Sequence, residues 1–117
     1  MNRLKELKVW HKAIDLVVDV YEQTSQFPTN EKYGLVSQIN RAVVSIPSNI
    51  EEGAGRNNKK EFNSFLGIAA GSTYELQTQI IIAYKVGYVE ATVLEQLEAQ
   101  IIEIQKMIYN LQKTLCN

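Results

Sequence analysis

The sequence predicts an all-α protein, a single antiparallel up-down-up-down four-helix bundle over residues 1–117 with a proline-kinked second helix. Three observations predict this fold. Apolar residues recur at helical spacings of three and four along four stretches, short segments containing glycine or proline separate these stretches, and no stretch alternates as a strand would. Long helices joined by short loops run in opposite directions, and 117 residues, 45% of them hydrophobic, are enough for one core.

The first helix is expected over about residues 8–26, and it carries two apolar stripes side by side. One stripe is Trp10, Ile14, Val17 and Tyr21, and the other is Val9, Ala13, Leu16 and Val20. A bundle helix needs one stripe for the core, so the surplus is expected at contacts between subunits. The helix should end at Phe27 and Pro28, because a residue before proline is pushed out of the α-helical region.

The second helix contains Pro47 in its interior. Thr29 and Asn30 are its candidate N-caps. Its apolar positions stay in phase on both sides of the proline: Leu35, Ile39, Ala42, Ile46 and Ile50. Although proline costs about 3 kcal/mol in a helix interior, this phase predicts one kinked helix, which Gly53 and Gly55 then end.

The third and fourth helices show the most regular apolar seams. Asn58 with Glu61 resembles a capping box at the start of the third helix, and Gly87 marks its end. The fourth begins near Glu90 or Thr92. One shared core is expected to contain Leu66, Leu76, Ile80, Ile101, Ile104 and Ile108, whereas Phe65, Ile68 and Ile82 fall off the seam and are expected between subunits. Gly67 and Gly71 are expected to let a neighbouring backbone approach closely.

No arrangement of residues predicts catalysis, a metal site or a cofactor. The chain has one histidine and one cysteine, Cys116, so neither a disulfide nor a histidine-rich metal site can form within it. The glycines at 53 and 55 follow a helix rather than a strand, which argues against a phosphate-binding loop. We expect a protein that is not an enzyme. The charged N-terminal stretch and the short apolar runs favour a cytoplasmic protein with no membrane contact.

A polar row follows one side of the second helix: Gln38, Arg41, Ser45, Asn49 and Glu52. Ser72, Glu75 and Gln79 form a matching row on the third helix. We interpret the two rows as a partly buried structural polar network. The alternative is that they face solvent. Antiparallel packing brings Arg41 within reach of Glu75, so the sequence predicts an ion pair between them that is at least half buried.

Basic residues occur at the start of the first helix and at the turn between the second and third. In an up-down-up-down bundle these places lie at the same end, which groups the following possible phosphate contacts for nucleic acid: Arg3, Lys5, Lys8, Lys12, Arg56, Lys59 and Lys60. Glutamates at 6, 51, 52 and 61 lie in the same region, and the net charge is −1. Any binding of RNA or DNA is therefore expected to be weak.

The sequence also resembles a known family over nearly its whole length. The resemblance rests on Ser-Ile-Pro-Ser-Asn-Ile at 45–50 followed by Glu52 and Gly53, and on these further positions: 6–10, 13, 27–28, 33–35, 38, 41–42, 56, 62, 65–66, 69, 71–72, 75–76 and 78. It is similar to the four-helix bundle proteins first noticed as reading frames in intervening sequences of bacterial 23S ribosomal RNA genes. That family includes the accessory variability determinant of diversity-generating retroelements, a pentameric barrel that binds nucleic acid and a reverse transcriptase.

The resemblance implies a bundle, a homopentamer and no enzymatic activity. The retroelement proteins are strongly basic and this chain is not. Two functions are therefore considered: a non-enzymatic interaction or scaffold protein that assembles into a ring, and a nucleic-acid-binding accessory protein that acts on RNA or DNA, with a reverse transcriptase as a possible partner.

Overall fold

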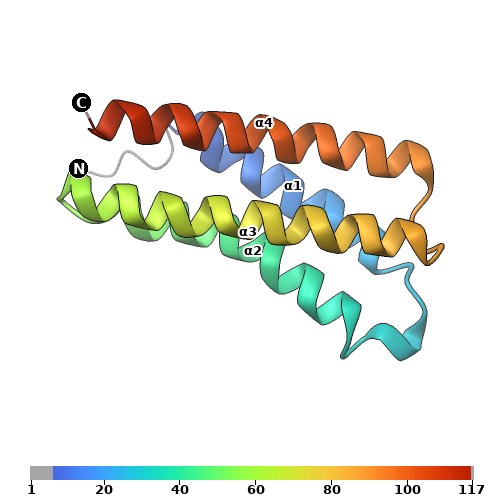
Figure 1. Cartoon of the computed structure of the whole chain (residues 1–117). Helices are drawn as coiled ribbons and strands as arrows, with labels where there is room; N and C mark the ends of the chain where they lie inside the picture. Colours follow the sequence, from blue (N-terminus) through green and yellow to red (C-terminus); the bar gives the residue numbers. More distant parts are fainter. Residues whose placement is uncertain (1–6, 117) are drawn as a thin grey trace.

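The computed structural model describes residues 7–116 and contains four long helices (Figure 1). They are α1 (Lys8–Thr24), α2 (Leu35–Ala54), α3 (Lys59–Lys85) and α4 (Ala91–Cys116), with a short 3₁₀ helix, η2 (Thr29–Glu31), between α1 and α2. No strand occurs in the described part of the chain. The predicted all-α four-helix class is confirmed.

Each long helix packs against its two neighbours around the bundle: α1 and α3 each contact both α2 and α4. The pair α1/α2 therefore lies on the opposite side of the bundle from the pair α3/α4. Two hydrogen bonds show how α4 is aligned along α3. Gln112 Nε2 donates to the backbone carbonyl of Asn63 at 3.4 Å, and Gln105 Nε2 donates to Gln77 Oε1 at 3.1 Å. Higher numbers on α4 thus face lower numbers on α3, and Figure 1 shows the two helices running past each other in opposite directions.

One hydrophobic core fills the space between the helices. All six predicted core residues of α3 and α4 are buried, and α1 contributes Val9, Ala13, Leu16 and Val20. The predicted core is confirmed for the described residues. The other apolar stripe of α1 is left half-buried or exposed.

The predicted start of the second helix is wrong. Thr29 lies in η2, and α2 begins only at Leu35. The reason is Glu31, whose Oε1 accepts a hydrogen bond from the backbone N–H of Leu35 at 3.2 Å and so takes the place of an N-cap side chain. Tyr88 Oη donates to the other carboxylate oxygen at 2.8 Å, which ties the loop before α2 to the loop after α3 and raises the pKa of the Tyr88 phenol.

The other helix boundaries follow the sequence signals closely. Asn58 Oδ1 accepts a hydrogen bond from the Glu61 N–H at 3.0 Å, as the predicted cap requires. Gly87 has a φ of +89°, the left-handed conformation predicted for a glycine after a helix. Helix α2 continues through the buried Pro47. In Figure 1 its first turns diverge from α3 and its later turns lie beside α3; a kink at Pro47 itself stays a prediction.

Of the helical glycines, Gly53 is packed tightly against a neighbouring helix and the glycines of α3 are not. A Cβ atom at Gly53 would lie 2.7 Å from the Phe65 Cβ and 2.9 Å from the Phe62 Cδ1. At Gly67 the nearest atom would be 3.7 Å away, and at Gly71 none lies within 4 Å. The predicted close packing at Gly67 and Gly71 is therefore wrong within this chain, and the tight contact is the crossing of α2 and α3 near their turn.

We expect Gly53→Ala to destabilise the fold by about 1–3 kcal/mol, because an added methyl forces α2 away from α3. Gly71→Ala is the matched control, and it should stabilise by up to about 1 kcal/mol because alanine favours the helix and meets nothing. Urea denaturation of the two variants at equal protein concentration measures the difference. An equal change in both would show that the crossing at Gly53 is not tight.

Candidate functional site

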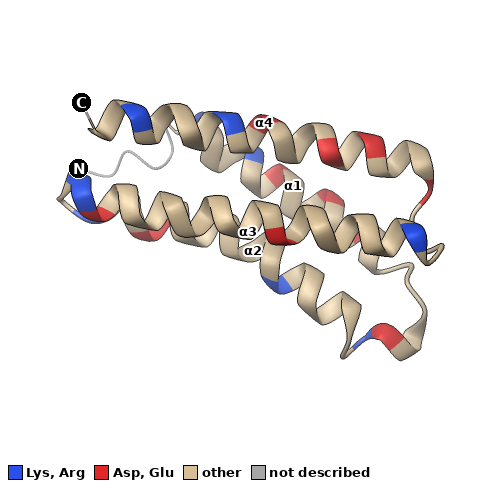
Figure 2. Ribbon diagram, viewed as in Figure 1, with Lys and Arg blue, Asp and Glu red and all other residues tan. Residues whose placement is uncertain are grey.

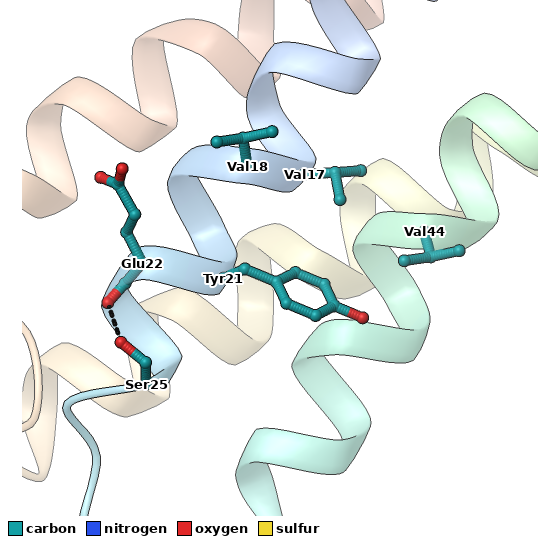
Figure 3. Close-up of a pocket in the computed structure, with 6 residues that line it drawn as sticks. All are labelled: Val17, Val18, Tyr21, Glu22, Ser25 and Val44. Carbon is teal, nitrogen blue, oxygen red and sulfur yellow. Dashed lines mark hydrogen bonds between the residues drawn. The ribbon is translucent and has the colours of Figure 1, made fainter.

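An apolar groove runs along the outer side of α1 and α2, which we call the α1/α2 face (Figure 3). It has a volume of about 540 Å³ and is lined by Val17, Val18, Tyr21, Glu22, Ser25 and Val44. The Tyr21 ring reaches from α1 toward α2, and the Glu22 carboxylate points away from it (Figure 3). Because α1 fills the core with one stripe, part of the other stays uncovered: Tyr21 is 46% exposed and Ile14 37%. Val18, which belongs to neither stripe, is 54% exposed and lines the same groove.

A second groove lies on the opposite side of the bundle, on the α3/α4 face. It has a volume of about 440 Å³ and is lined by Tyr74, Ile102, Gln105, Lys106, Tyr109 and Asn110. Tyr74 and Tyr109 are 60% and 62% exposed. Large apolar side chains that gather on one surface are typical of a contact site, and this chain has them on two opposite faces.

The outer side of α3 carries a further stripe of exposed residues, none of which lines either groove. Ile68, Glu75 and Ile82 follow at intervals of seven residues, and all three are exposed. Phe65 behaves differently, because it is partly buried over Gly53 and the Arg56 guanidinium lies 5.0 Å from its ring centroid. Of the off-seam residues, Ile68 and Ile82 are thus uncovered, whereas Phe65 is used within the chain.

Part of the predicted polar row makes contact between α2 and α3. The hydroxyl groups of Ser45 and Ser72 are hydrogen-bonded to each other. Asn49 Nδ2 donates to the Ser45 carbonyl at 2.8 Å. Gln38 is exposed, and Glu52 pairs with Arg56 instead of joining the row. On α3, Gln79 is buried, and its Oε1 accepts no hydrogen bond from the described residues.

The predicted half-buried ion pair between Arg41 and Glu75 is wrong for the single chain. Both residues are exposed, and neither takes part in the ion pairs found within residues 7–116. The reason is the position of Arg41 on α2, where it lines a shallow groove of about 400 Å³ together with Tyr21, Ser37, Asn40, Val44 and Ser45. Arg41 thus borders the α1/α2 face and makes no ion pair with α3.

The predicted basic end is partly neutralised. Arg56 pairs with Glu52 at 3.2 Å and with Glu61 at 3.3 Å, and Lys12 pairs with Glu103 at 3.3 Å. Lys8, Lys59 and Lys60 are exposed and make no ion pair in the described part of the chain. Arg3 and Lys5 lie outside the described residues. Figure 2 shows lysine and arginine gathered toward the end of the bundle where the described chain begins and ends.

Sequence reasoning missed one contributor to this end. Lys113 lies in the last turn of α4, beside Gln112, which is hydrogen-bonded to Asn63 in the first turns of α3. The Lys113 ammonium is 5.6 Å from the Tyr109 ring centroid. The sequence could have placed Lys113 at this end, because the last helix of an up-down-up-down bundle must return to the end where the first one starts.

The comparison with known proteins supports the same fold. The family model described as "23S rRNA-intervening sequence protein" matches residues 5–110. The chain belongs to this family. A crystal structure of a protein of unknown function from the S23 ribosomal protein family of Bacteroides thetaiotaomicron superposes with a TM-score of 0.83 at 22% identity, covering 90% of this chain and 95% of that one. At this identity the likeness concerns the fold alone. No curated protein matches the chain.

Within residues 7–116, no three side chains of His, Cys, Asp or Glu gather as metal ligands would. None of the described helices is both long enough and apolar enough to cross a lipid bilayer. The surface features that stand out in this 23S rRNA-intervening sequence protein are its two apolar faces and its basic end.

Proposed function

We propose that this protein is a non-enzymatic interaction protein that assembles with copies of itself into a closed ring in the cytoplasm. The observation that carries the proposal is the uncovered apolar stripe of α1, which with Val44 of α2 forms the α1/α2 face. Covering apolar surface is favourable by about 25 cal/mol per Å². A second apolar surface on the opposite side of the bundle supplies a partner for the first.

The positions of the two faces determine the kind of assembly. When one surface of a subunit binds a different surface of the next, the contact is heterologous, and repeating it gives either a ring or an open filament. Two faces on opposite sides suit such a head-to-tail contact, because each subunit can then bind a neighbour on either side. The resemblance to the retroelement protein favours a ring that closes as a homopentamer.

Glutamate on the α1/α2 face should break the assembly. We expect Val18→Glu and Val44→Glu each to give a species near the subunit mass of 13.3 kDa by light scattering, because a carboxylate cannot be covered without a partner. Val86→Glu is the control, since Val86 is 55% exposed but lies just after α3 and lines neither groove. A wild-type protein that stays monomeric at micromolar concentration would contradict the proposal, as would full assembly of both face variants.

Nucleic-acid binding is the second candidate function, and the convergence of helix ends favours it. Lys8, Lys59, Lys60 and Lys113 are free of ion pairs in the described part of the chain and belong to helix ends that meet. A ring would repeat this group in every subunit. Glu51, Glu52 and Glu61 lie in the same region and should offset much of the attraction.

A titration with mixed RNA and DNA tests this candidate. We expect weak binding near about 150 mM salt, with the affinity falling on a log–log slope of about −0.7 to −0.9 for each phosphate neutralised. The double variant Lys59→Ala with Lys60→Ala should flatten that slope, whereas Lys32→Ala, far away in the loop before α2, should not. Sub-micromolar affinity at this salt, lost in the double variant, would make nucleic-acid binding the leading function.

A further inference from the structure

The two apolar grooves differ in charge. Glu22 lines the groove of the α1/α2 face, and Lys106 lines the groove of the α3/α4 face. Both side chains are exposed, and neither takes part in an ion pair within residues 7–116. The Glu22 carboxylate points away from Tyr21, so it lies at the edge of its groove (Figure 3). A partner that covers one groove must therefore come close to a carboxylate, and a partner that covers the other must come close to an ammonium group.

Each of these charges is repeated seven residues away on its own helix. Asp15 precedes Glu22 on α1, and Lys113 follows Lys106 on α4. Residues seven apart lie on nearly the same side of a helix. Asp15 and Lys113 are also exposed, and neither takes part in an ion pair in the described part of the chain. We call Asp15 and Glu22 the α1 acids, and Lys106 and Lys113 the α4 lysines.

A head-to-tail contact brings the α1 acids to the α4 lysines. Within one chain α1 packs beside α4, and α2 packs beside α3. The two faces lie on opposite sides of the bundle, so a copy shifted sideways without turning places its α4 on α1 and its α3 on α2. The hydrogen bond from Gln100 to Asp19 and the ion pair between Lys12 and Glu103 show that α1 and α4 run in opposite directions. The α1 acids therefore meet the α4 lysines along an antiparallel contact.

The equal spacing lets both ion pairs form at once. In an antiparallel contact, the alignment that places Glu22 beside Lys106 also places Asp15 beside Lys113, because each helix has its two charges seven residues apart. An ion pair at one end of this contact thus supports the ion pair at the other end.

The same alignment covers apolar side chains. Val18 lies between the α1 acids in sequence, and Tyr109 lies between the α4 lysines, so these two side chains come together. Val18 lines the groove of the α1/α2 face and Tyr109 lines the groove of the α3/α4 face. They are 54% and 62% exposed in the single chain. The apolar contact supplies the attraction, and the charges around it determine the alignment.

The charges favour this alignment over one in which the next copy is not displaced along the bundle. The acids of α4 lie in its first half and its lysines in its second half (Figure 2). Because Gln100 is bonded to Asp19, Glu22 of one copy would face Glu95 and Glu98 of an undisplaced neighbour, and like charges placed together are unfavourable. To bring Glu22 to the first α4 lysine, the neighbour must be displaced by about nine residues, which is about 14 Å.

We propose that the α1 acids of one copy pair with the α4 lysines of the next copy, and that these pairs set the alignment in which the α1/α2 face binds the α3/α4 face. The inference rests on the proposed self-assembly and adds its partner residues and its alignment. In a closed ring all copies lie at the same height, so a displaced contact also requires each bundle to be inclined to the ring axis.

Reversing the charges on one helix tests the pairs. The α1 variant, Asp15→Lys with Glu22→Lys, and the α4 variant, Lys106→Glu with Lys113→Glu, each place like charges at every contact. Each should associate about tenfold more weakly than the wild type, or worse. A combined variant with all four substitutions has opposite charges at every contact again, and it should associate like the wild type. Sedimentation velocity at equal protein concentration measures the association.

Glu95→Lys is the matched control. Glu95 is an exposed acid of α4 that lines neither groove, and it comes close to Glu22 of the next copy only if the copies are not displaced. The control should therefore associate like the wild type. Stronger association would indicate the undisplaced alignment and would contradict the inference.

The outcomes separate this inference from the proposal beneath it. Because the α1 acids and the α4 lysines are exposed in the single chain, all variants should keep wild-type helix content by circular dichroism. If the α1 and α4 variants associate like the wild type, or if the combined variant does not recover, the inference is wrong and self-assembly stands. If the wild type is monomeric, both fail.

Discussion

The rest of this structure depends on the crossing of α2 and α3. At Gly53 the two helices come so close that a single methyl group would meet Phe62 and Phe65, and farther along a hydrogen bond between Ser45 and Ser72 joins them. These contacts fix the register of the pair. The core side chains of α1 and α4 then pack on the inner side of this pair and complete the bundle.

The crossing of α2 and α3 also determines which side chains are exposed on the surface of the bundle. Because α1 fits against α2 and α4 with one stripe, Ile14 and Tyr21 of its second stripe stay exposed, as does Val44 of α2. On the other side, Tyr74, Ile102 and Tyr109 are uncovered for the same reason. The two apolar faces are therefore consequences of the packing inside.

The helices and the core could be predicted from the sequence because they depend on local signals. Helical periodicity identified the buried seams, Asn58 identified the start of α3, and Gly87 identified its end. The start of α2 was missed because its cap comes from Glu31, four residues ahead, rather than from a side chain at the helix boundary. Gly53 was interpreted as a helix stop, since its contact with Phe65 depends on a crossing in space that no spacing reveals.

The candidate site was less predictable for a related reason. The surplus stripe of α1 could be recognised from its spacing, but the direction in which a long side chain such as Arg41 points depends on its neighbours. Small residues at Ser45 and Ser72 occupy the contact with α3, and Arg41 lies beside Tyr21 instead. The basic end was underestimated, because the return of α4 adds Lys113 to it.

Disulfide trapping across the two faces tests the central claim most directly. Cys116 is the one cysteine of the chain, so Val18→Cys and Tyr109→Cys can be combined in a chain that also carries Cys116→Ser. A disulfide forms only where the two Cα atoms come within about 7 Å. Head-to-tail contacts predict a ladder of linked chains that ends at the closed ring, and no links in either single-cysteine variant. A double variant that stays unlinked under mild oxidation, or a single variant that forms dimers, would contradict this account.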